Sequence, residues 1–180
     1  MEIKMSIVER RYWANIKMNE KFINLKTHSG YRIFQYDYSG ENIYLSPEVN
    51  NIDFGLEILS ALGASRFVLP APRNDVVVHP DVEYDAPLHN YILTEERYRK
   101  WVTETMEKFG YKTKRAMFKN MKNCDVVKSS ENMKIKPWFH NKLEAWSLDG
   151  ISEEDNVVIP ADSSAEEIGV AARLALSRCI

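Results

Sequence analysis

The last quarter of the chain, residues 142–180, carries the pattern that most limits the possible folds. Residues 143–146 predict a short strand, residues 148–156 a polar turn, and the β-branched run 157–159 a buried strand that ends at Pro160. Ser163 precedes Glu166 by three residues, the spacing at which a serine and a carboxylate cap a helix start. This end of the chain therefore predicts two strands followed by a capped helix.

The same block contains an ordered set of segments: LE-W, DGISEED, VxIP, DSSxEEIG and a closing A-RLALSRC. With the upstream segments YKTKRAMFKNMKNC and IKPWFHNKLEAW, the second half of the chain resembles the bacterial contact-dependent growth inhibition immunity proteins, the CdiI family. The first half matches that family only in outline. The resemblance implies a cytosolic, non-enzymatic inhibitor that binds the toxic C-terminal domain of a matching delivered toxin, often a nuclease.

Short strands are expected in the first third of the chain. Apolar and polar residues alternate over residues 22–25, 31–36 and 43–45, and turn signals stand at 28–30 and 39–40. Such a pattern predicts antiparallel strands that are joined by tight turns.

Helix signals follow at three places. Asp53 is expected to cap a helix that ends at Gly63, and Thr94 a strongly amphipathic helix that ends at Gly110. Thr113 is expected to cap a shorter helix.

A long surface loop and a hairpin complete the pattern. Residues 67–93 hold four of the seven prolines and predict a long loop, in which 76–78 could form an edge strand, and residues 126–136 predict a hairpin. Strands and helices do not alternate strictly. We therefore expect an α+β fold with a single domain over residues 1–180, in which a mostly antiparallel (mixed) sheet packs against about four α-helices.

Composition limits the classes of protein. A hydrophobic content of 44% in 180 residues is enough for a substantial core. Charged residues interrupt the first 13 residues, so this segment lacks the apolar core of a signal peptide. No apolar run is long enough to span a membrane. A cytoplasmic location is therefore expected. Cys124 and Cys179 are expected to be reduced thiols.

Charge is unevenly distributed, although the formal net charge is only −2. Basic residues gather between 112 and 128, whereas residues 75–85 and 149–155 are acidic. The net charge argues against a nucleic-acid-binding protein. An acidic patch would speed association with a basic toxin.

No motif for catalysis, metal or nucleotide binding stands out, so no cofactor is expected. The histidines are isolated from one another and from the cysteines, which does not fit a zinc site, and the glycines form no phosphate-binding loop. Cys124 with His140 is the one cysteine–histidine pair close in sequence, and a packed thiol is the favoured interpretation.

An inhibitor that binds a toxin domain is therefore the favoured function. Two alternatives stay open: a small enzyme with an unrecognised site, and a nucleic-acid-binding module that uses residues 112–128. The candidate toxin contacts are the loop residues Asp75, Asp81, Glu83, Tyr84 and Asp85 and the acidic-turn residues Asp149, Glu153, Glu154 and Asp155. Discrimination between toxins is expected to depend on the divergent first half.

Overall fold

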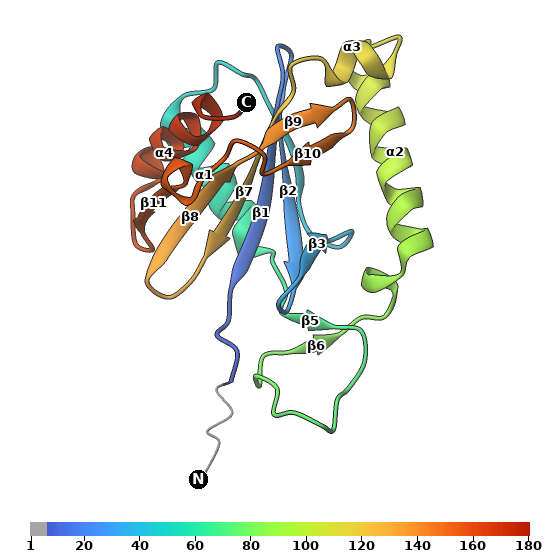
Figure 1. Cartoon of the computed structure of the whole chain (residues 1–180), viewed down its shortest axis with the longest axis vertical. Helices are drawn as coiled ribbons and strands as arrows, with labels where there is room; N and C mark the ends of the chain where they lie inside the picture. The colour runs from blue at the N-terminus through green and yellow to red at the C-terminus, as the bar shows by residue number, and fades with distance from the viewer. Residues whose placement is uncertain (1–6) are drawn as a thin grey trace.

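Seven strands form the central antiparallel sheet of the described chain, residues 7–180 of this computed structural model (Figure 1). The strands are β1 (Tyr12–Met18), β2 (Ile23–Gly30), β3 (Phe34–Tyr36), β4 (Asn42–Leu45), β7 (Lys122–Lys128), β8 (Asn132–Pro137) and β11 (Val157–Pro160). Their order is β11-β8-β7-β1-β2-β3, and β4 also pairs with β2. The first six residues, on which part of the expectation about a signal peptide rests, lie outside the described residues.

Two small ladders flank this sheet. β5 (Val68–Leu69) pairs in parallel with β6 (Glu83–Tyr84), and β9 (Phe139–Lys142) pairs antiparallel with β10 (Ala145–Ser147). Within residues 7–180 the α-helices are α1 (Asn51–Gly63), α2 (Tyr91–Phe109), α3 (Lys114–Phe118) and α4 (Ala165–Ser177), and the 3-10 turns are η1 (Pro87–His89) and η2 (Glu153–Asp155). The predicted α+β fold, with a mostly antiparallel sheet and about four α-helices, is confirmed.

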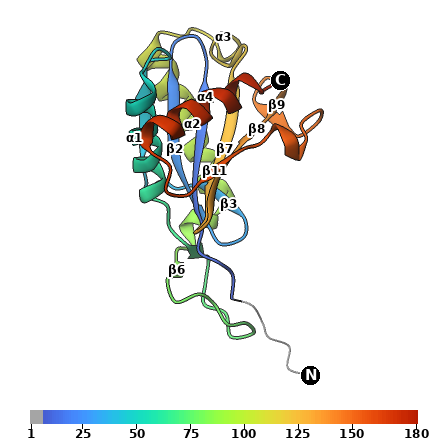
Figure 2. The ribbon, with the colours of Figure 1, turned by 90° about the vertical axis from the view of Figure 1, so that its left-hand side faces the viewer.

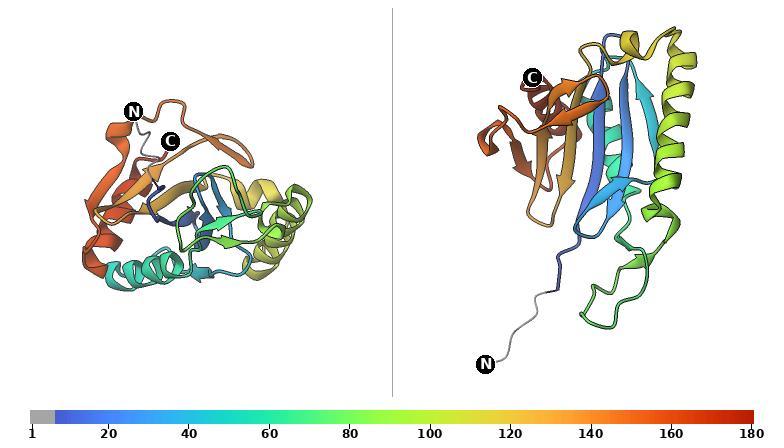
Figure 3. Two further views of the ribbon diagram at one scale, coloured as in Figure 1. Left: turned by 90° about the horizontal axis from the view of Figure 1, so that it is seen from below. Right: turned by 45° about the vertical axis from the view of Figure 1, so that its right-hand side comes forward.

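Helices α1 and α4 cover one face of the sheet (Figures 2 and 3). Alternate residues of the strands, such as Ile16 and Leu25, point into this layer and are fully buried against Phe54 of α1 and Ile168 of α4. Helix α2 packs on the second face of the sheet, at the end where β2 and β3 lie, and contributes to a second apolar cluster around Phe22 (Figure 1). None of the helices within residues 7–180 is long and apolar enough to cross a membrane.

Three helices begin at a different cap from the one that the sequence predicts. In α4 the capping box is formed by Ser164 and Glu167, one residue later than expected, because the Ser163 hydroxyl donates to the Pro160 carbonyl at 2.7 Å instead. Asn50 caps α1 in place of Asp53, and Asn90 caps α2 in place of Thr94. In both helices the asparagine side chain accepts the N–H three residues later, so the first turn starts earlier.

Two of the three further helix predictions are confirmed, and one is wrong. Gly110 has φ +70° and ends α2 in the left-handed conformation, as expected, and Thr113 caps α3. Gly63 is the last residue of α1 with ordinary helical geometry, and the cap that follows, Ala64, is right-handed. The prediction of a left-handed cap at Gly63 is therefore wrong.

Two strand predictions are also wrong. Residues 28–30 belong to β2 and not to a turn, and the turn comes at Tyr31–Ile33, where a Cβ on Gly30 would lie 1.9 Å from the Ile33 carbonyl oxygen. Leu143 and Glu144 form the turn between β9 and β10 and not part of a strand. The predicted hairpin over 126–136 is present as β7 and β8.

Candidate functional site

The loop between β5 and β6, residues 70–82, projects beyond the lower end of the sheet (Figures 1 and 2). We call it the β5–β6 loop. Its middle, residues 76–78, forms no strand, contrary to the edge strand considered from the sequence, because Glu83 and Tyr84 pair with β5 instead. Val77 is 61% exposed, so this part of the loop is open to solvent.

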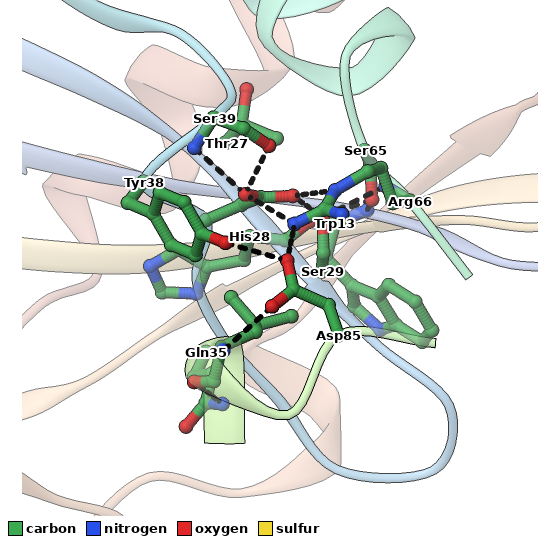
Figure 4. A network of polar contacts seen from close by, with 12 residues as sticks. Trp13, Thr27, His28, Ser29, Gln35, Tyr38, Ser39, Ser65, Arg66 and Asp85 are labelled. Carbon is green, nitrogen blue, oxygen red and sulfur yellow. Dashed lines mark hydrogen bonds and ion pairs between the residues drawn. The ribbon is translucent and has the colours of Figure 1, made fainter. Parts of the chain in front are cut away.

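Arg66 forms an ion-pair network with Asp37 and Asp85 at the base of this loop (Figure 4). Its Nε and Nη2 donate to the Asp37 carboxylate at 2.7 and 2.9 Å, and Nη2 also donates to Asp85 at 2.9 Å. The hydroxyl of Tyr38 donates to the same Asp85 oxygen at 2.8 Å. Since Asp85 directly follows β6, the network fixes the end of the loop to the body of the protein.

Both carboxylates of this network are charged at neutral pH. Burial of Asp37 would raise its pKa, but hydrogen bonds from Arg66, Ser29 and Ser39 lower the pKa to about 2. Burial also opposes the shift at Asp85, yet bonds from Tyr38 and Arg66 lower the pKa of that carboxyl. Asp85 is only 11% exposed and faces inward, so it positions the loop and is a poor candidate for direct contact with a partner.

The other predicted residues of the loop region are exposed. They are Asp75, Asp81, Glu83 and Tyr84. Asp75 pairs with Arg73 at 2.6 Å, but these side chains are 65% and 49% exposed, so the pair contributes little to stability. Tyr84 is 46% exposed. These four residues therefore present charge and an aromatic ring to solvent near a fixed base.

The acidic turn lies elsewhere, in the connection from β10 to β11 (Figure 1). Its candidate residues are Asp149, Glu153, Glu154 and Asp155. The carboxylate of Asp155 accepts the Ser152 N–H at 2.7 Å in the capping box of η2. Glu153 lies 3.7 Å from the Lys134 ammonium. Asp155 thus stabilises its own turn, and the fold does not bring the turn together with the β5–β6 loop.

Buried polar side chains on the second face of the sheet were missed in the sequence analysis. Asn15, Lys26, Asn123 and Asp125 are buried, and Lys17 and His28 are partly buried. The alternation of apolar and polar residues along these strands was visible, but a polar strand face normally meets water. Helix α2 and the β9–β10 hairpin, which cover this face, come from distant parts of the sequence (Figure 3).

The half of this face near β9 and β10 is an internally satisfied network. Asn15 donates through Nδ2 to Asn123 at 2.7 Å and to Asp125 at 2.9 Å. Lys17 donates to Asn15 at 2.8 Å, and the Trp138 indole donates to Asp125 at 3.0 Å. Burial lowers the pKa of Lys17 to about 8, although the Asp125 charge opposes the shift. These groups bind one another and need no ligand.

The fold does not assemble the cysteine–histidine pair that an enzyme would need. Cys124 is fully buried in the core, and its Sγ lies 3.5 Å from Sγ of Cys179. The ring of His140 stacks on Trp146 and makes a hydrogen bond to the Leu143 carbonyl at 2.8 Å. The basic residues of 112–128 are spread over α3, β7 and the connections next to them.

Comparisons with known proteins agree on one family. A family model described as CDI immunity protein, CdiI, matches residues 12–179. The immunity protein CdiI-YPIII of Yersinia pseudotuberculosis serotype O:3 (strain YPIII) is 47% identical over 175 residues, which is 97% of this chain and 99% of that protein.

Solved structures extend this agreement to three dimensions. A chain of the CdiA-CT/CdiI toxin and immunity complex from Yersinia pseudotuberculosis superposes with a TM-score of 0.92 at 47% identity, covering 95% of this chain and 98% of that chain. A protein of unknown function from Neisseria meningitidis superposes with a TM-score of 0.81 at 34% identity, covering 99% and 100%.

Proposed function

Because the chain belongs to the CdiI family of contact-dependent growth inhibition immunity proteins, we propose that it binds and neutralises the C-terminal toxin domain of a matching CdiA protein. The observation that carries this proposal is the near full-length likeness, in sequence and fold, to a chain of a CdiA-CT/CdiI toxin and immunity complex. A protein inhibitor needs a rigid surface of about 800 Å² and no catalytic group. We infer that this chain acts by binding alone and is not an enzyme.

The finer parts of the proposal concern the toxin and its location. A nuclease toxin fits an acidic inhibitor, because enzymes that bind nucleic acid usually carry basic surfaces. Delivered toxins of this class act inside the recipient cell, so the inhibitor is proposed to work in the cytoplasm. Residues 1–180 are proposed to form a single immunity-protein domain.

The β5–β6 loop and strand β6, which follows it, are the proposed toxin contact. Asp81, Glu83 and Tyr84 are all exposed, and the Arg66 network holds the base of the loop. A loop whose base is already fixed loses less conformational entropy when it binds a partner. Asp75 and the acidic turn are retained as weaker candidate contacts, since the turn carboxylates already stabilise η2.

Charge reversal tests this contact directly. In the double variant Asp81→Lys, Glu83→Lys we expect the association rate with the matching toxin domain to fall, and its dependence on salt to become weaker. The matched control is Glu96→Lys, Glu107→Lys on the exposed side of α2, which makes the same change in net charge. An equal effect of both pairs would assign the effect to net charge and remove the loop from the interface.

Protection of cells tests the function itself. Cells that produce the toxin domain are expected to grow when they also produce this chain, and to stop growing when they produce an unrelated immunity protein. Growth arrest in both cases would contradict the proposed function.

A further inference from the structure

A pocket of about 270 Å³ lies between the second face of the sheet and helix α2. We call it the α2 pocket. Its lining includes Lys17, Lys26, His28, Tyr36, Arg97 and Trp101. None of the residues that line it is Asp or Glu, whereas three are lysine or arginine. The pocket therefore has an excess of positive charge and of hydrogen-bond donors.

Lys26 is the buried lysine of this pocket. Lys26 is only 6% exposed. Its Nζ lies 3.7 Å from the centre of the Trp101 ring and 4.7 Å from the centre of the Tyr36 ring. Within residues 7–180 no carboxylate pairs with it, in contrast to Arg66. Burial, and to a smaller extent the nearby Lys17, lowers the pKa of Lys26 well below its usual range. A bound anion would offset this effect and stabilise the charged ammonium.

Two residues that line the pocket each carry an unsatisfied polar atom. Nδ1 of His28 and Nε1 of Trp101 are buried without a hydrogen-bond partner among the described residues. Burial lowers the pKa of His28 to about 3, so the imidazole is neutral and one of its two nitrogens carries a proton. Buried polar groups are normally paired, and unpaired ones call for a partner such as a ligand.

The neighbouring polar network does not use these groups. Asn15, Asn123 and Asp125 bind one another and Lys17, as described above. Arg97 stands at the rim, where its guanidinium lies 3.9 Å from the centre of the Tyr38 ring and donates to the Pro87 carbonyl. Arg97 thus adds a positive charge to a pocket whose buried lysine has no carboxylate partner among residues 7–180.

We propose that the α2 pocket binds a small oxyanion, a phosphate or carboxylate group, with the Lys26 ammonium as its main contact and the His28 imidazole as the second polar contact. The site is separate from the proposed toxin contact on the β5–β6 loop, and it does not depend on the proposed function.

Titration followed by ¹⁵N–¹H correlation spectra tests the proposal on the whole purified chain. Sodium phosphate and sodium acetate are added in separate arms, against sodium chloride of equal ionic strength, and the indole N–H signal of Trp101 is followed. We expect a saturable shift with a dissociation constant of about 1 mM or tighter in at least one arm. A response to phosphate alone assigns phosphate esters as the ligand class, and a response to acetate assigns carboxylates.

Variants distinguish the pocket from general ion effects. Lys26→Met is expected to weaken the binding by about tenfold or more, because a hydrogen bond to a charged group is lost. The matched control Lys100→Met, on the exposed side of α2, is expected to leave it unchanged. The proposal is overturned if wild-type protein shows no saturable shift beyond the chloride control, a result that does not depend on the folding of any variant.

Discussion

Arg66 donates two hydrogen bonds to the fully buried carboxylate of Asp37, from Nε at 2.7 Å and from Nη2 at 2.9 Å. The two residues come from different connections, one after β3 and the other between α1 and β5. The same guanidinium reaches Asp85 at the end of the β5–β6 loop. One side chain therefore links the sheet edge, the first helix and the proposed toxin contact.

Removal of the Asp37 carboxylate is the first prediction. In Asp37→Ala we expect the free energy of unfolding to fall by about 3 kcal/mol, because Arg66 loses its main partner in a largely buried site. Urea denaturation measures the change. Asp75→Ala removes one member of an exposed pair and should cost less than about 1 kcal/mol. Equal losses in the two variants would contradict the importance of the buried network.

Stability is expected to depend on the protonation of His28. Burial lowers the pKa of this group from 6.5 to about 3 in the folded chain. Between these values the unfolded chain binds a proton that the folded chain does not, so this contribution to stability is present above pH 6.5 and is lost as the pH falls towards 3. We therefore expect the urea midpoint of the wild type to fall between about pH 7 and pH 5, and that of His28→Gln to fall less. Identical pH profiles would show that His28 is not buried in its neutral form.

The crossing of α1 and α4 is expected to tolerate no added methyl group. A Cβ on Gly169 would lie 2.0 Å from the Asn51 carbonyl oxygen, and one on Gly55 would lie 1.7 Å from that of Ala165. Gly169→Ala should therefore lower the free energy of unfolding by about 1–3 kcal/mol. Gly63→Ala is the matched control in α1, because nothing lies within 4 Å of its Cβ position. It should be neutral or stabilising by up to about 1 kcal/mol, and a stabilising effect of Gly169→Ala would contradict this packing.

Mild oxidation is expected to join Cys124 and Cys179. Their Sγ atoms are 3.5 Å apart, and the hydrogen bond from Cys124 lowers the pKa of Cys179 to about 7, although partial burial opposes this shift. Thiolate is the reactive form, so diamide should oxidise both thiols to a disulfide while it is itself reduced to the hydrazine. Mass spectrometry should find the loss of two hydrogen atoms within one chain. Cys124→Ser keeps only Cys179 and is the control that shows no such loss. A wild-type chain that keeps both hydrogen atoms after the treatment would contradict the prediction.

The sequence predicted the elements better than their ends. Strand–turn–helix order in the last quarter was correct because β-branched runs and cap residues act locally. The start of α4 was displaced by one residue because both Ser163 and Ser164 stand three residues before a glutamate, and only the fold directs the Ser163 hydroxyl to Pro160. The starts of α1 and α2 were misplaced for a similar reason, since asparagine and the predicted residue compete for the same cap.

Candidate sites were predicted less well, because long-range contacts decide them. The acidic character of residues 75–85 was visible, but the inward direction of Asp85 depends on Arg66 and Tyr38, which come from other connections. From the sequence, Lys26 fits a solvent-facing position of a strand, and His28 belongs to a predicted turn. Only the position of α2 over β2 shows that they are buried.

The most direct test of the central claim is a titration of this purified chain with the matching CdiA C-terminal domain and, separately, with a toxin domain from an unrelated system. We predict a dissociation constant of about 1–100 nM for the matching domain and no measurable binding to the unrelated one. Absence of binding to the matching domain, or equal affinity for both, would contradict the account of this chain as a specific immunity protein.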